Sequence, residues 1–188
     1  MSALYLRTLF ALPGSGETGR EVITAEARGC KTVLFVGPSG CGKDFACTYL
    51  AGRTGLKFWG STSQVIALEI SRQTGAPLEV VLGSRHGNRE RWREIGDELR
   101  ADDPAHLLKV CLSHGAKLLN GTRALPELKA ARQIIDHIIW IDRPGIPTDP
   151  MLEFGPYDVD MHIGNYGDRA NFCRALDTLA KALNLKAA

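Results

Sequence analysis

The sequence predicts a three-layer α/β fold in which helices cover both faces of a parallel central sheet. A continuous run of apolar and β-branched residues at 32–36 is typical of a strand buried on both faces, and 136–142 is a second clear strand. Helical patterns separate these runs from each other and from shorter strand candidates. Strands that alternate with helices along a chain form parallel sheets that are covered on both sides.

In the first half of the predicted domain, glycine and proline residues mark the ends of the elements. We expect a strand at 32–36, a helix at 44–51 that ends near Gly52 and Gly55, a short strand at 56–59, and a helix at 64–74 that Ser61–Ser63 begin and 75–77 end. Residues 78–84 fit no single type of element.

The second half continues the alternation of helices and strands. Residues 85–100 form a predicted helix in which Trp92, Ile95 and Leu99 fall on one apolar stripe. After it we expect a helix with Asp103 as N-cap and Pro104 at its first turn, a strand at 116–120, a helix at 125–133, a strand at 136–142, a Pro- and Gly-rich loop at 145–158, a short strand at 160–163, and a terminal helix with Asp168 as N-cap.

The composition is that of a single globular domain of 188 residues, 44% hydrophobic and 23% charged. A net charge of +2 argues against an extended nucleic-acid surface, and no apolar run is long enough to span a membrane. The five cysteines show no Cys-x-x-Cys pair and no metal-ligand spacing, which favours reduced thiols and a cytoplasmic location. We expect an N-terminal extension without chemistry at 1–29 and one domain at 30–188.

One octapeptide points to a ligand. It fits the phosphate-binding pattern G-x-x-x-x-G-K-[ST] except at its last position, and it reads Gly37-Pro38-Ser39-Gly40-Cys41-Gly42-Lys43-Asp44. The glycines allow backbone N–H groups to surround phosphate oxygens, and Lys43 would reach the β- and γ-phosphates of ATP. An ordinary Gly-rich turn between a strand and a helix is the alternative. Asp44 replaces Ser or Thr, which leaves the coordination of Mg²⁺ open.

Arginines form a second candidate feature. Arg85, Arg89, Arg93 and Arg100 cluster along one flank of the predicted 85–100 helix and could hold a phosphate. The alternative is a solvated helix face with ion pairs such as Glu90–Arg93 and Arg93–Asp97. Lys43, Arg123 and Arg143 each follow a predicted strand, and ligands of parallel sheets bind at the carboxyl ends of the strands. We therefore expect these three cations near one cleft.

Together these segments resemble the P-loop nucleoside monophosphate kinases, most closely the deoxynucleoside monophosphate kinases of phage type. The resemblance covers about residues 31–184 by inspection. It rests on the loop ending Gly42-Lys43-Asp44, the Arg-rich helix at 89–100 followed by Asp103-Pro104, the strand followed by Thr122-Arg123 and Glu127, the strand end Ile141-Asp142-Arg143-Pro144, and the pattern Asp-x-x-Ile-x-Asn-x-Gly at 160–167.

The resemblance implies a P-loop nucleoside triphosphate hydrolase fold and transfer of the ATP γ-phosphoryl group to a (deoxy)nucleoside monophosphate. In that interpretation the octapeptide with Lys43 binds ATP. Arg143 contributes to the same nucleotide site, and Asn165 and Gly167 lie near the base of ATP. Arg123 with one or more of Arg85, Arg89 and Arg93 holds the acceptor phosphate or the transferring charge. Ser61, Thr62 and Ser63 contact the acceptor, or they only cap a helix.

The chain also departs from this family. Where an Asp that helps to organise Mg²⁺ is usual, the sequence has Asn120-Gly121, so Asp44 is the remaining carboxylate near the metal, acting through water. A kinase of another small metabolite and a nucleotide-binding protein without transfer activity remain alternatives. The expected partners are small-molecule nucleotides, and the sequence leaves a homodimer open.

Overall fold

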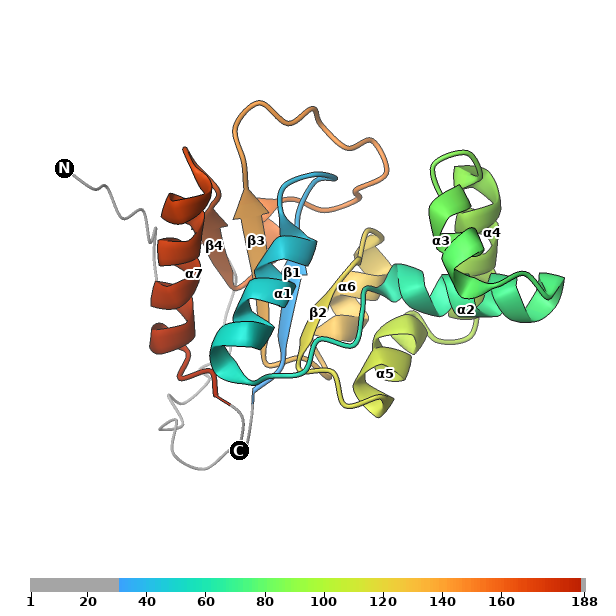
Figure 1. The fold of residues 1–188 in the computed structure, drawn as a ribbon, viewed down its shortest axis with the longest axis horizontal. Helices are drawn as coiled ribbons and strands as arrows, with labels where there is room; N and C mark the ends of the chain where they lie inside the picture. Colours follow the sequence, from blue (N-terminus) through green and yellow to red (C-terminus); the bar gives the residue numbers. More distant parts are fainter. Residues whose placement is uncertain (1–30, 187–188) are drawn as a thin grey trace.

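The computed structural model describes residues 31–186, and the predicted extension at 1–29 lies outside them. Its centre is a parallel sheet of four strands, in the order β2 (Leu118–Asn120), β1 (Val33–Val36), β3 (His137–Asp142) and β4 (Met161–Gly164) (Figure 1). The register places Leu34 between Leu119 and Ile138. The predicted parallel sheet is confirmed.

Helices flank both faces of the sheet because successive side chains of β1 alternate between them. Val33 and Phe35 join one apolar cluster with α1 (Lys43–Thr54) and α7 (Arg169–Ala182). Leu34 and Val36 join a second cluster with α5 (His106–Ser113) and α6 (Leu125–Ala131). All four β1 residues are fully buried, as the continuous apolar run predicted.

Three further helices form a lobe beside the sheet (Figure 1). They are α2 (Thr62–Thr74), α3 (Leu78–Ser84) and α4 (Arg89–Arg100), and a small cluster of Ala67, Val81 and Trp92 joins them. Trp92 and Ile95 are buried and Leu99 is partly buried, so the predicted apolar stripe is confirmed. The segment 78–84, for which the sequence indicated no element, is helix α3.

Several element boundaries differ from the prediction. The short strand expected at 56–59 is reduced to one isolated bridge between Phe58 and Leu118 at the outer edge of the sheet. The helix expected from Pro104 begins at His106, because the Asp103 carboxylate accepts the Ala105 N–H at 3.0 Å in a turn before the helix. Helix α1 continues through Gly52 and ends at Thr54, with Gly55 as its C-cap.

The last part of the chain follows the prediction closely. Asp168 caps α7 by accepting the Asn171 N–H at 2.7 Å. The segment 145–158 is a loop with a single 3₁₀ turn, η1 (Pro156–Asp158), and Figure 1 shows it arching over the carboxyl ends of the strands. Within residues 31–186, no helix combines the length and the apolarity that crossing a membrane requires.

Candidate functional site

The octapeptide forms the loop between β1 and α1. Gly37 has a φ of 136°, and a Cβ on it would lie only 2.7 Å from the carbonyl oxygen of Ile141 on β3. Position 37 therefore excludes a side chain, both by its backbone conformation and by its close approach to the neighbouring strand. The predicted order of strand, glycine loop and helix is confirmed.

Lys43 is the first residue of α1, and its side chain turns back along the loop. Its Nζ donates to the carbonyl oxygens of Gly37 and Pro38, each at 2.7 Å, and lies 3.6 Å from Cys41 Sγ. Burial lowers the pKa of Lys43, and the positive charge of Arg123 lowers it further. The ammonium group thus has loop carbonyls as its partners and lines the cleft described below.

Asp44 contacts the end of β2 through an amide. Asn120 Nδ2 donates to Asp44 Oδ1 at 2.9 Å. Asn120 is only 2% exposed, and within residues 31–186 neither its Oδ1 nor Oγ1 of the buried Thr122 has a hydrogen-bond partner. A buried acceptor without a partner costs about 1–3 kcal/mol. The Asn120 oxygen beside the Asp44 carboxylate therefore fits a ligand that supplies hydrogen-bond donors, such as metal-bound water.

Gly121 accounts for the absence of an acid next to Asn120. Its φ is 111°, and a Cβ would clash with Thr62 Oγ1 and lie 3.1 Å from Thr62 N. The start of α2 thus packs directly against the chain after β2, and any side chain at position 121 would separate them. A carboxylate at position 121 therefore has no space. The polar side chain at the end of β2 is the Asn120 amide instead.

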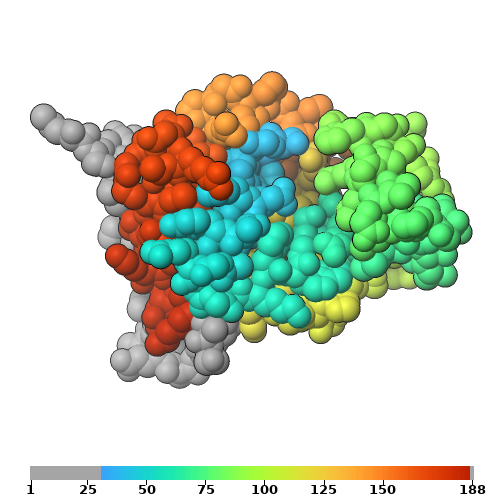
Figure 2. Space-filling view, viewed as in Figure 1, coloured from blue at the N-terminus to red at the C-terminus, as the bar shows by residue number. Residues whose placement is uncertain are grey.

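A cleft collects residues from four separate segments, and Figure 2 shows a hollow between the loop after β1 and the α3–α4 region. These segments are the glycine loop at 37–44 (the phosphate-type loop), the start of α2, the residue that follows α3, and the end of β2 with the chain that follows it. The lining residues are Gly37, Ser39, Gly40, Lys43, Asp44, Ser61, Ser63, Arg85, Asn120, Gly121, Thr122 and Arg123.

The cleft brings together most of the residues that the sequence singled out. Ser61 is the N-cap residue of α2, but its side chain makes no capping hydrogen bond. The Ser61 hydroxyl therefore does not cap the helix, which was the alternative interpretation of this segment. Arg85 follows α3, with its guanidinium 5.4 Å from the centre of the Trp92 ring. Thr62 is 2% exposed and does not line the cleft.

Arg123 is held by two carboxylates. Its Nη1 donates to both oxygens of Asp149 at 2.9 and 3.2 Å, and its backbone N–H donates to Glu127 Oε2 at 3.1 Å. Burial raises the pKa of Glu127, although Arg100, 3.8 Å away, opposes this. Asp149 was missed by sequence reasoning, because it lies in a Pro-rich loop that has no periodic pattern.

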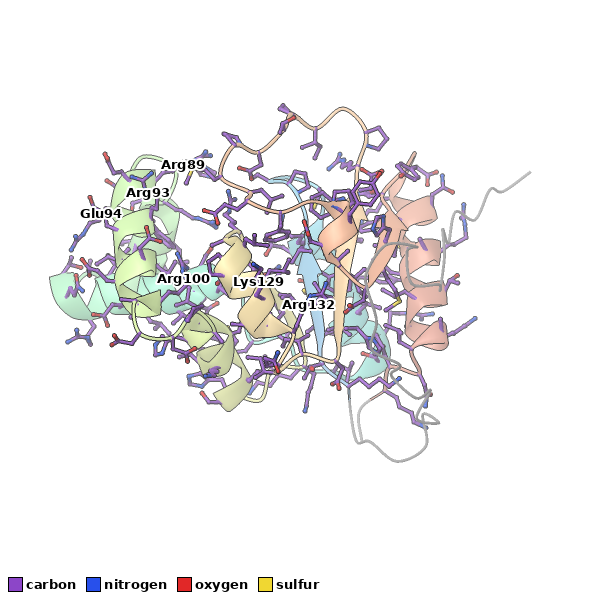
Figure 3. The ribbon with its side chains drawn as sticks, turned by 180° about the vertical axis from the view of Figure 1, so that it is seen from behind. Arg89, Arg93, Glu94, Arg100, Lys129 and Arg132 are labelled. Carbon is purple, nitrogen blue, oxygen red and sulfur yellow. The ribbon has the colours of Figure 1, made fainter. Side chains whose placement is uncertain are left out.

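Arg89 and Arg93 are exposed on α4 and do not line the cleft. Figure 3 shows α4 running from Arg89 to Arg100, and Arg100 lies beside α6. The helix carries the ion pairs Arg91–Glu94 at 3.3 Å and Arg100–Asp97 at 2.8 Å in place of those that the alternative interpretation named for Arg93. Of the predicted arginine row, only Arg85 reaches the site.

Two side chains support the glycine loop from the ends of neighbouring strands. Arg143, which follows β3, donates from Nη1 to the carbonyl oxygen of Gly40 at 2.9 Å. Asn165, which follows β4, donates from Nδ2 to the carbonyl oxygen of Cys41 at 2.8 Å. Cys41 is buried, and burial raises the pKa of its thiol, which favours the neutral form. Both predicted residues thus lie against the loop.

The donor set in the cleft suits anions better than bare metal ions. Within residues 31–186, no three His, Cys, Asp or Glu side chains are grouped as a metal site. Three cations, Lys43, Arg85 and Arg123, instead line the cleft together with residues of the glycine loop. No protein-family model matches this chain, and no curated protein matches it either.

Proposed function

We propose that this protein is a nucleotide kinase with a P-loop nucleoside triphosphate hydrolase fold, which transfers the γ-phosphoryl group of ATP to a (deoxy)nucleoside monophosphate. One observation carries the proposal: a phosphate-type loop and two further cations from separate segments, Arg85 and Arg123, line one cleft. Phosphoryl transfer depends mainly on positioning two substrates and neutralising charge, and this arrangement supplies both.

The two sides of the cleft have different roles in this proposal. Backbone N–H groups of 39–43 and the Lys43 ammonium bind the ATP phosphates, and Lys43 then exchanges its bonds to two loop carbonyls for bonds to phosphate oxygens. Arg85 and Arg123 hold the acceptor phosphate and the charge that develops on the transferring group. Ser61 and Ser63 contact the acceptor at the start of α2.

Mg²⁺ fits the residues beside the loop, where it would neutralise charge on the phosphates. Asp44 would hold its water shell, since Mg²⁺ keeps several waters and takes only one or two protein carboxylates. Asn120 fixes the Asp44 carboxylate by its 2.9 Å hydrogen bond and adds a buried oxygen without a partner. In this proposal the Asp44 carboxylate and the Asn120 amide together would hold the water shell of Mg²⁺.

The arrangement favours transfer over simple nucleotide binding. A protein that only binds ATP needs the loop and Lys43, but it has no use for a second cationic wall formed by Arg85 and Arg123. The same wall would serve a kinase of another small phosphorylated metabolite, so the acceptor has to be identified by experiment. We further propose a cytoplasmic location, where both nucleotides are available.

The proposal is tested by measuring ADP release with Mg-ATP against a panel of ribo- and deoxynucleoside monophosphates. We expect turnover that depends on at least one member of the panel. Turnover with another phosphorylated metabolite alone would assign the protein to a different kinase class. ATP hydrolysis that ignores every acceptor, or no turnover at all, would contradict a kinase activity.

A further inference from the structure

The loop after β3 lies beside the cleft and touches the phosphate-type loop at three points. Arg143 donates to the Gly40 carbonyl at 2.9 Å, and the Ile146 side chain lies 3.5 Å from where a Cβ on Gly40 would be. The third contact is made by Asp149, whose Oδ2 accepts the Ser39 N–H at 3.2 Å. Figure 1 shows this loop above the carboxyl ends of β1 and β3.

The Asp149 side chain is only 9% exposed. Besides Ser39 N–H, its carboxylate accepts Arg123 Nη1 at 2.9 and 3.2 Å. A backbone amide of the phosphate-type loop and a guanidinium are also the donors that a phosphoryl group would use in this cleft. The carboxylate thus holds two groups that an incoming phosphate needs.

We propose that Asp149 is an internal anionic ligand of the cleft, which nucleotide phosphates must displace before they bind. This inference rests on the proposed function, because it assumes that the loop binds phosphate. The carboxylate and the phosphate cannot share Ser39 N–H and Arg123, since like charges in one enclosed site repel each other. Asp149 therefore lowers the affinity of the cleft for nucleotides.

The attachment of the loop allows this displacement. Among the backbone hydrogen bonds of the described residues, none involves 143–148, so side chains hold this stretch in place. The following residues are anchored more firmly: Phe154 is buried in the core, and Glu153 bonds to Arg123 and Leu125 at 3.0 Å each. We expect 144–151 to move while 152–155 stays in place, because segments with few backbone bonds open at low cost.

Binding measurements test the inference directly. Isothermal titration calorimetry with ADP and with pyrophosphate is performed on the wild type, Asp149→Asn and Asp149→Ala. If the carboxylate holds the donors about nine-tenths of the time, its removal tightens the apparent Kd about tenfold, and we expect a gain of roughly three- to tenfold. Glu153→Gln is the matched control, because it removes a carboxylate from the same loop whose partner among the described residues is the Leu125 N–H.

A second readout separates competition from a merely structural role. We expect ADP to speed limited proteolysis within 144–151 of the wild type, and to have little effect on Asp149→Asn, in which the carboxylate no longer holds the loop. Unchanged or weaker ADP binding by both Asp149 variants, while the wild type binds ADP, would overturn the inference alone. Failure of both the wild type and the variants to bind ADP would overturn the inference together with the proposed function.

Discussion

Replacing Asn120 by Asp tests how the polar group at the end of β2 supports Asp44. The substitution keeps the shape of the side chain but removes the amide that donates to Asp44 Oδ1 at 2.9 Å. It also places a second carboxylate at a position that is 2% exposed. Burial and the neighbouring carboxylate both raise the pKa of the new acid, so its charged form opposes folding.

The size of the effect follows from this geometry. Two unit charges about 4 Å apart repel by ~4 kcal/mol at an effective dielectric constant of about 20. The Asp44 carboxylate reaches solvent, which screens part of this repulsion. We therefore expect Asn120→Asp to lower the free energy of unfolding by about 2–3 kcal/mol at pH 8, or roughly 4–12 °C in Tm for a chain of this size.

The assay is calorimetric unfolding at pH 5 and pH 8, with and without Mg²⁺, and Asn120→Ala is the control. The deficit of Asn120→Asp should grow as pH rises above about 4, because the unfolded state then releases a proton that the folded state retains. Mg²⁺ should recover part of it. Asn120→Ala should show neither response, and equal pH profiles for the two variants would refute the reasoning.

Three further substitutions test the other parts of the site. Lys43→Ala should abolish ATP use in the ADP-release assay without loss of folding by circular dichroism, and retained activity would remove the loop from the mechanism. Asp44→Ala should raise the Mg²⁺ concentration for half-maximal activity about tenfold, with Asp44→Ser intermediate; an unchanged Mg²⁺ titration would contradict a metal role. Arg85→Ala should raise the acceptor KM by at least about tenfold, the value of one charge-assisted hydrogen bond, whereas the exposed Arg93→Ala should change it less than twofold; equal effects would refute the assignment of Arg85.

Much of the fold was predictable because burial leaves a clear pattern in a parallel sheet. The β1 run is apolar at every position because both of its faces are covered. The prediction of a strand at 56–59 was wrong, because among these residues Phe58 alone forms a bridge with the edge of the sheet. A sequence pattern of four residues cannot distinguish such a single bridge from a short strand. Helix α3 is only 7 residues long, too short to show a reliable period.

The candidate site was predictable where it follows strand ends and less so elsewhere. Lys43, Arg123 and Arg143 lie near the loop, as the rule for parallel sheets indicates. The predicted row of arginines identified only one residue of the site, Arg85. The helix begins at Arg89, so the turn at 85–88 places Arg85 outside the helical periodicity that the prediction assumed. Asp149 depends on the path of an irregular loop, which carries no periodic signal.

The supports of the glycine loop have a thermodynamic consequence for any ligand. Arg143 and Asn165 fix the Gly40 and Cys41 carbonyls from two neighbouring strands, so the loop acquires its shape during folding. A phosphate then meets amides that are already oriented, and little backbone entropy is lost on association. Removing either support should therefore make nucleotide binding entropically less favourable even though neither Arg143 nor Asn165 is among the described residues that line the cleft.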